Sequence, residues 1–499
     1  MAHTGLRARR GLHVVPPRLR HVAALTSLAA LLGAFASSAS ATVRIVSTTK
    51  SGANYYSAIQ SAVNASHAGD WVLIEPGVYD ESVRVQTPNL HIRGMNRNTV
   101  ILDGQSKVAS GGRNGIEVYK TNDVWIENLT VRNFDRENAN GGNGNEIWWN
   151  GGDGSGKVGA HGWWGSYLTT YDTGLNGGYG IFTDNETEGS WDHIYASGFN
   201  DSGMYLGACQ ECDAKITSAT MENNALGYSG SNSGGKLIIE KSLIQNNTSG
   251  IVPNSENPGD GPPPQDGECG RPNIENPNPE PVITSTKLKR CTIIRNNTIT
   301  NNNNLTVPVN NSTAPAPWGT GVVLPGDYAD QVSGNVITNN ENDGVLGFEY
   351  PNPFTPNFEE PEKGFEGSLF FQLSGNRVAE NTFGNDGSRG GEFTGDIALM
   401  GGFSELFPGS RYPESHSVDN CAIGNSITDA TFPANIEGTW GCQHSQTPSP
   451  GGGFAAVEYL LRLPAEAPAP SERSPQPAPG PQPTMPNACK GVPANPLCH

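Results

Sequence analysis

The chain is poor in charged residues, and basic residues are the scarcest of them. Asp, Glu, Lys and Arg make up 16% of 499 residues, and 31 Lys and Arg face 49 Asp and Glu, which gives a net charge of −18. Binding of nucleic acid needs a cationic surface, so this balance argues against a nucleic-acid partner. It also disfavours a polyanionic glycan unless Ca²⁺ bridges the two, and Ca²⁺ is the one cofactor that the sequence leaves open. No metal ligand can be named.

Long apolar runs are also missing, with one short exception near the start. Five Arg precede the apolar stretch 22–36, and Ala39, Ser40 and Ala41 follow it. This layout predicts a secretory signal peptide over residues 1–41, because the apolar run is too short to span a bilayer comfortably. Its removal leaves 26 basic and 49 acidic side chains, a net charge of −23. We expect a secreted, extracellular chain without a transmembrane segment, and attachment to the cell surface stays open.

Cysteine is sparse but even in number, with eight residues that all follow the predicted signal peptide. In an exported chain this predicts disulfides. The one C-x-x-C, Cys209 with Cys212, has no second such pair, so a local staple is favoured over a zinc site. Spacing along the chain suggests, without establishing, the pairs Cys269–Cys291, Cys421–Cys442 and Cys489–Cys498.

What the chain does contain is a repeat of about 23 residues between residues 176 and 348. Short apolar runs recur in each unit, and Asn pairs close most units: Asn223–Asn224, Asn246–Asn247, Asn296–Asn297 and Asn339–Asn340. A fixed period of this length indicates units that must stack to bury their apolar faces. Three short strands per unit, with Gly and Asn at the corners, predict an all-β fold, a right-handed parallel β-helix. Inward Asn side chains would form a ladder from coil to coil, and a short helix at 55–66 would cap the N-terminal end.

The first coils carry a family resemblance. The segment G-D-W-V-L-I-E-P-G-V-Y-D-E-S-V (69–83), followed by N-L-H-I-R-G (89–94) and T-V-I-L-D-G (99–104), resembles the pectin-lyase-like β-helix superfamily. With the later repeats, the resemblance covers residues 42–445. It implies carbohydrate processing, since the superfamily contains polysaccharide lyases, hydrolases, esterases and epimerases. The R-x-P-x-x-R segment of pectate lyases, the ordered motifs of polygalacturonases and the D-P-H-D segment of epimerases are absent, so no branch is assigned.

Four predicted insertions interrupt the coils at 138–177, 253–286, 303–318 and 349–367. All flank the same strand of the repeat, so they would wall one face of the solenoid and form a groove. The alternative is that they are tolerated surface loops.

Aromatic residues suggest where a glycan would bind. The predicted loop 138–177 holds His161 and four of the nine Trp: Trp148, Trp149, Trp163 and Trp164. Flat aromatic faces stack on sugar rings, and Tyr205 and Tyr228 on the groove strands extend this predicted binding surface. The alternative is that the Trp side chains form the loop's own core.

Acidic residues near the groove strand are the candidate catalytic groups. Asp201 precedes one groove strand and Glu222 precedes the next corner, so the two carboxylates would lie about 5 Å apart per coil step, as in a glycosidase or a Ca²⁺ site. Asp192 and His193 loosely resemble the W-I-D-H segment of pectate lyases, whose Asp lies near Ca²⁺, with the spacing shifted by one residue. The alternative is that these are solvated turn residues.

The C-terminal segment 446–499 reads as a Pro-rich linker with a short Cys-containing tail, mostly disordered. We expect a monomer whose β-helix, residues 42–445, cleaves a polysaccharide by elimination or hydrolysis in the groove. The alternative function is a non-catalytic extracellular protein that binds a glycan or a matrix partner along the same face.

Overall fold

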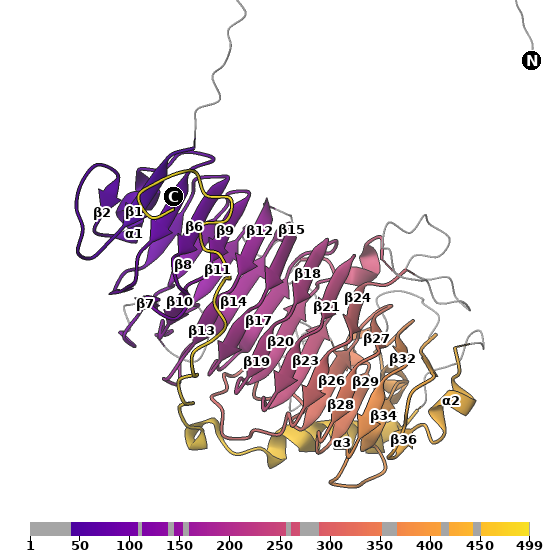
Figure 1. Cartoon of the computed structure of the whole chain (residues 1–499). Coiled ribbons are helices and arrows are strands. Elements are labelled where there is room, and N and C mark those ends of the chain that lie inside the picture. Colours follow the sequence, from indigo (N-terminus) through magenta and orange to yellow (C-terminus); the bar gives the residue numbers. More distant parts are fainter. Residues whose placement is uncertain are drawn as a thin grey trace, which may run out of the picture. The chain divides into compact units, whose positions relative to one another are not determined.

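The chain winds as a right-handed parallel β-helix, as predicted (Figure 1). The computed structural model describes residues 41–107, 112–137, 144–152, 159–255, 261–269, 289–351, 367–410, 419–442 and 451–498. Residues 41–499 form one compact unit. The signal peptide predicted for residues 1–41 lies, up to residue 40, outside the described residues.

Each coil contributes one strand to each of three parallel sheets, which have thirteen, ten and eleven strands in the described part of the chain. Sheet 1 contains, in spatial order, β2 (Tyr55–Tyr56), β1 (Val43–Val46), β3 (Trp71–Ile74), β6 (Leu90–Gly94), β9 (Val124–Glu127), β12 (Ala160–Ser166), β15 (Glu186–Asp192), β18 (Ala214–Thr217), β21 (Leu237–Glu240), β24 (Thr292–Arg295), β27 (Gln331–Ser333), β32 (Arg377–Ala379) and β35 (Cys421–Ile423). Sheet 2 contains β4 (Gly77–Tyr79), β7 (Val100–Asp103), β10 (Thr130–Arg132), β13 (Thr169–Tyr171), β16 (Tyr195–Ser197), β19 (Thr220–Glu222), β22 (Leu243–Gln245), β25 (Thr298–Thr300), β28 (Val336–Thr338) and β33 (Thr382–Gly384). Sheet 3 contains β5 (Val83–Val85), β8 (Ile116–Tyr119), β11 (Ile147–Asn150), β14 (Tyr179–Asp184), β17 (Ser202–Gly207), β20 (Leu226–Ser231), β23 (Ser249–Asn254), β26 (Thr320–Pro325), β29 (Asp343–Phe348), β34 (Gly395–Leu399) and β36 (Thr431–Phe432).

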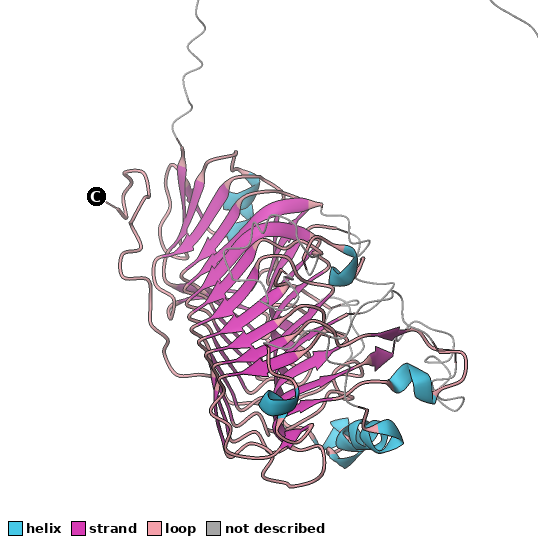
Figure 2. Cartoon of the chain, turned by 90° about the vertical axis from the view of Figure 1, so that its right-hand side faces the viewer, coloured by secondary structure: helices cyan, strands magenta, loops and turns pink. Residues whose placement is uncertain are grey.

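Helices are short and peripheral (Figure 2). α1 (Ile59–Asn64) buries Ile59, Ala62 and Val63 against the first coil, in agreement with the predicted N-terminal cap. The remaining elements are α2 (Ile436–Thr439), α3 (Gly453–Glu466), the 3₁₀ helices η1 (Pro264–Asp266), η3 (Phe403–Leu406) and η4 (Pro470–Glu472), and the antiparallel pair β30 (Tyr350–Pro351) and β31 (Phe370–Phe371).

The repeat places equivalent side chains one above another inside the coil. In sheet 3, Ile181 pairs with Met204, Met204 with Tyr228 and Tyr228 with Ile251, and all four side chains are fully buried. Strand pairing in register stacks these side chains, which explains why apolar runs recur about every 23 residues in the sequence.

The inward Asn side chains form two main ladders rather than the single predicted one. At the corner between sheets 2 and 3, each side-chain amide donates to the next oxygen along the series Asn224, Asn247, Asn302, Asn340 and Asp386, at 2.9–3.1 Å. At the corner between sheets 1 and 2, a second ladder contains Asn297, Asn335, Asn381, Asn425 and Glu437. The pair Asn296–Asn297 thus belongs to a different corner from the other pairs, because more than one corner of the coil is closed by an inward Asn. The corner before sheet 1 also has one such bond, from Asn376 to Asn420.

Each of these corners holds a residue with a left-handed backbone just before the inward one. Asn223, Asn246, Asn301 and Asn339 have φ between 54° and 60° at the corner of sheets 2 and 3. Asn tolerates this conformation better than other residues with a side chain. The two Asn residues of each pair therefore have different roles. The first adopts the left-handed turn conformation, and the second hydrogen-bonds to the neighbouring coils.

Four disulfides are formed, and they are the pairs that spacing suggested: Cys209–Cys212, Cys269–Cys291, Cys421–Cys442 and Cys489–Cys498. Among the described residues, no helix has the length and apolar character needed to cross a membrane.

The C-terminal segment, residues 451–498, differs from the expected disordered tail. Its α3 packs on the outer face of sheet 3, where Tyr459 donates a 2.6 Å hydrogen bond to the buried Asp343. The chain then runs back along the solenoid to the first coils (Figure 1). Arg97 donates to the carbonyl of Pro483 at 2.9 Å, and Arg93 to that of Ala488 at 3.0 Å. A Pro-rich chain needs no core of its own when an existing surface supplies hydrogen-bond donors.

Candidate functional site

The predicted catalytic residues Asp192 and His193 lie together at the corner after β15 of sheet 1. His193 Nδ1 is 2.8 Å from Asp192 Oδ2, and both side chains are about two-fifths exposed, at 43% and 39%. His193 occupies the left-handed corner position with φ 55° and stacks on Tyr167 at 4.5 Å. The pair is therefore accessible, but it sits on a different sheet from the predicted groove.

Glu222, at the end of β19, belongs to sheet 2. It pairs in register with Ser197, so it does not stack on Asp201, which precedes a strand of sheet 3. Its two carboxylate oxygens accept hydrogen bonds from the Tyr195 hydroxyl and the Gln245 amide, both at 2.6 Å. Burial, and then this bond to Glu222, raise the pKa of the Tyr195 phenol.

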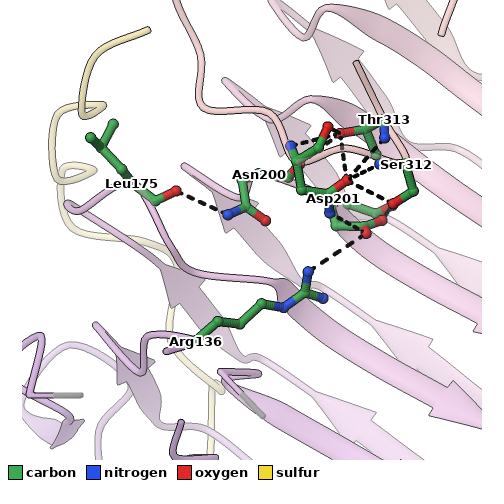
Figure 3. Close-up of polar contacts among 8 residues, drawn as sticks. Arg136, Leu175, Asn200, Asp201, Ser312 and Thr313 are labelled. Carbon is green, nitrogen blue, oxygen red and sulfur yellow. Dashed lines mark hydrogen bonds and ion pairs between the residues drawn. The ribbon is translucent and has the colours of Figure 1, made fainter. Parts of the chain in front are cut away.

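Asp201 lies at the start of β17, where a long loop meets the coil (Figure 3). Its Oδ2 accepts a 2.6 Å hydrogen bond from the Asn310 side chain, its Oδ1 accepts one from Ser202 at 3.1 Å, and Arg136 Nη1 is 4.0 Å away. The Thr313 hydroxyl donates to the backbone carbonyl of Asn200 at 2.8 Å. These contacts clamp the loop 303–318 over the corner that begins the sheet 3 groove.

Residues 138–177 are a complete coil where the structure describes them, and not the predicted loop. They contain β11, β12 and β13, one strand for each sheet. Strand alternation turns Trp149 and Trp163 inward, where both are fully buried and pack near Trp191. Tyr228 is also fully buried inside the coil. These three side chains are core residues, and the prediction that they contact substrate is wrong.

Trp148 and Tyr205 point outward and belong to an aromatic row on sheet 3. Trp148 stacks on Phe182 with ring centroids 5.1 Å apart, and Phe182 meets Tyr205 edge-on at 4.9 Å. Tyr179 stacks on Phe182 at 4.6 Å. We call Trp148, Phe182, Tyr205 and Tyr179 the aromatic row.

Trp164 and His161 lie on sheet 1, away from this row. Trp164 stacks at 6.1 Å on Trp125, which continues a ladder through His91 to Trp71. His161 is exposed, with Nε2 3.8 Å from Asp123. The predicted aromatic surface is therefore divided between two sheets, because Trp148 lies on β11 of sheet 3 whereas His161 and Trp164 lie on β12 of sheet 1.

Beside the aromatic row lies a polar row that sequence reasoning missed. Asp184 accepts a 2.9 Å hydrogen bond from the Trp148 indole, and Asn150 donates one to Glu117 at 3.0 Å. Asn150 pairs in register with Asp184 in the adjacent strand. Glu117 pairs in register with Trp148, two residues before Asn150, so its bond to Asn150 is diagonal. We call Glu117, Asn150 and Asp184 the polar row. The signal for it was present in the sequence, since Trp148 and Asn150, like Phe182 and Asp184, are two residues apart in a strand and share one face.

Further along sheet 3 lies a cavity of about 660 Å³. Asp201, Tyr179 and Tyr205 line it from the strands, and residues 311–313 and 315–317 line it from the clamped loop. Asn254, Tyr350 and Pro351, at the edges of two other predicted insertions, also line it. The insertions that the structure describes thus border sheet 3, although residues 256–260, 270–288 and 352–366 lie outside the described part.

Three buried acids, Asp135, Glu146 and Asp172, lie close enough to affect one another's pKa. Burial and the neighbouring Asp172 raise the pKa of Asp135 to about 7. Burial also raises the pKa of Glu146 well above its ordinary value. In the described residues no group of three or more His, Cys, Asp or Glu has the geometry to hold a metal ion. Burial thus favours the neutral form of both the Asp135 and the Glu146 carboxyl.

Comparisons with known proteins concern the fold alone. Pectin methylesterase PemA from Erwinia chrysanthemi is 12% identical over 70% of this chain and 91% of its own, with a TM-score of 0.35. An alginate lyase from a Paenibacillus species is 12% identical over 75% and 93%, at 0.34, and the pre-mature gene product 12 of bacteriophage phi29 is 10% identical over 74% and 42%, at 0.40. No protein-family model matches, and neither does any curated protein.

Proposed function

We propose that this chain is an extracellular protein that binds and cleaves polysaccharide along the outer face of sheet 3. The observation that carries the proposal is the aromatic row beside the polar row, both leading into the cavity at Asp201. Aromatic faces stack on the C–H faces of sugar rings, while adjacent carboxylates and amides bind hydroxyl groups. The four disulfides support a location outside the cytosol.

The polar row supplies two carboxylates for acid–base chemistry. Glu117 and Asp184 lie on β8 and β14, with β11 between them. In register, Glu117 is opposite Phe182, two residues before Asp184, so two strand spacings and two residues separate their backbones by about 12 Å. Asn150 and Trp148 of β11 bond the two carboxylates from between them, so both side chains reach toward β11, which shortens the separation toward the roughly 6.5–9.5 Å of inverting glycosidases. Asp201 offers a third carboxylate at the cavity. The acidic net charge of −18 favours a neutral glycan over a polyanion.

The test is a product assay on a panel of neutral and acidic polysaccharides, read as new reducing ends and as unsaturated ends. If the site on sheet 3 hydrolyses the glycan, new reducing ends form, and Asp184→Asn or Glu117→Gln abolishes their formation. Asp192→Asn, His193→Gln and Glu222→Gln test the alternative sites on sheets 1 and 2. If only the latter variants lose activity, the site lies on those sheets and the sheet 3 proposal falls.

A non-catalytic glycan-binding protein is the second candidate, because the candidate acids are already bonded. Glu222 accepts two hydrogen bonds, and Asp201 and Asp184 accept bonds from Asn310 and Trp148. Binding without any product, lost in Trp148→Ala, would support this second function.

A further inference from the structure

The cavity on sheet 3 has more apolar than polar side chains in its lining. On its strand side, Asp201, Ser229, Ser231 and Asn254 lie among apolar side chains that include Leu226, Val252, Val323 and Phe348. Apolar side chains from α3, η3 and the following turn line the opposite side, namely Val457, Leu460, Leu461, Phe403 and Phe407. A ligand that fills this space therefore needs a polar part and an apolar part.

The apolar side is open to a ligand rather than sealed by the protein. Leu461 lines the cavity and is 57% exposed, although Val457, one turn earlier on the same helix, is only 8% exposed. A bare saccharide placed here would set hydroxyl groups against a wall without hydrogen-bond partners, which is unfavourable. An alkyl chain would instead be removed from water, which is favourable.

We propose that this cavity binds a saccharide that carries a linear alkyl or acyl chain. The sugar would lie against Ser231 and Asn254, and the chain would lie beneath α3 along Leu460 and Leu461. The volume of about 660 Å³ is in the usual range for ligand sites. This inference rests on the proposed glycan-binding function and narrows its substrate class to amphipathic glycans.

The first experiment is calorimetric titration of the full chain with methyl, hexyl and octyl glucoside, each below its micelle concentration. Every methylene that becomes buried should tighten binding about threefold to fourfold. An affinity that does not change with chain length would overturn the proposal. If octanol binds as tightly as octyl glucoside, the sugar does not contribute to binding and the proposal is contradicted.

The second experiment uses two variants of exposed apolar residues. Leu461→Ser should make the affinity nearly independent of chain length. Val78→Ser should leave the dependence on chain length unchanged, because Val78 is similarly exposed at 56% but lies on β4 of sheet 2 and does not line the cavity. Equal losses in both variants, or no loss in Leu461→Ser, would contradict the proposal.

A third variant separates this inference from the proposed function. Trp148 belongs to the aromatic row and does not line the cavity. Trp148→Ala should weaken polysaccharide binding while the alkyl glucoside series stays intact. If the protein binds polysaccharide but its affinity for alkyl glucosides does not depend on chain length, only the proposed amphipathic ligand is contradicted. If the chain-length dependence is present but no polysaccharide binds, the proposed function is contradicted and the amphipathic site is still supported.

Discussion

Single residues at the corners carry much of the specificity of this fold. Asn at the left-handed position and Asn at the inward position both follow from the sequence, since pairs of Asn at a fixed period favour turns that stack. What the sequence did not reveal is which corner each pair serves. Asn296–Asn297 and Asn339–Asn340 look alike as dipeptides, and only strand pairing separates them.

The end of one ladder gives a prediction about pH. Asp386 closes the ladder and accepts a hydrogen bond from Asn340, and burial raises its pKa to about 7. Because the folded pKa lies above the unfolded one, the folded state binds more protons between about pH 4 and 7, so stability falls as pH rises through that window. Asp386→Asn keeps the acceptor and removes the charge. Its melting temperature should equal that of the wild type near pH 4 and exceed it at pH 8.

This prediction is checked by thermal denaturation of both proteins at the two pH values. Asp135 and Asp330 also have pKa values raised to about 7, so the wild type keeps part of its pH dependence in either case. A difference between the proteins that is the same at pH 4 and pH 8 would contradict the assignment to Asp386.

Adjacent tryptophans of one strand give a second prediction at this scale. Trp148 points outward in the aromatic row, whereas Trp149 is fully buried. Trp149→Ala should lower the free energy of unfolding by roughly 3–5 kcal/mol. Trp148→Ala should leave it nearly unchanged and weaken glycan binding about threefold to tenfold. Chemical denaturation and binding measured on both variants check this, and a reversed pattern would mean that the two rings face the other way.

At the scale of whole elements, the ladders bind one coil to the next. Asn302 donates to Asn340 and accepts from Asn247, so it joins three coils at once. Three sheets and one cap were predictable because the hydrophobic period fixes them. The assignment of residues 138–177 to a loop was wrong, because Gly-rich stretches hide short strands whose Trp residues fill the core.

Substitution of one Asn of the ladder should show how much the ladder contributes to the free energy of unfolding. Asn302→Ala removes the oxygen that accepts from both the Asn247 side-chain amide and its backbone N–H, and a buried donor without a partner costs roughly 1–3 kcal/mol. Urea unfolding should report a loss of that size. Thr298→Ala is the control, since the Thr298 side chain is exposed on neighbouring β25. Equal losses in both variants would argue against the ladder as their cause.

At the scale of the unit 41–499, the C-terminal segment is the feature that sequence composition misjudged. A Pro- and Ala-rich stretch has no core of its own, which predicted disorder. The structure supplies it with donors from the first coils, such as Arg93 and Arg97, that lie far away in sequence. No local pattern reveals such partners.

Truncation after residue 480 tests this contact. It keeps α3 and the hydrogen bonds from Arg473 and Ser474 to the loop before β26, and it removes those to Arg93 and Arg97 and the cover over Trp71. Amide exchange should become faster in β1, β3 and β6, while β24 and β26 stay protected, because stability is local in a stacked array. Uniform acceleration along all coils would instead mean that the segment supports the whole unit.

The same contact has a consequence for biosynthesis. The ribosome delivers the N-terminal coils first, yet Trp71 and Leu73 receive their cover from residues near Cys489 and Cys498 that emerge hundreds of residues later. Until then a nascent solenoid presents an apolar patch on its oldest coil. Synthesis of residues 489–498, and closure of the Cys489–Cys498 disulfide, therefore completes a surface that the first coils leave open.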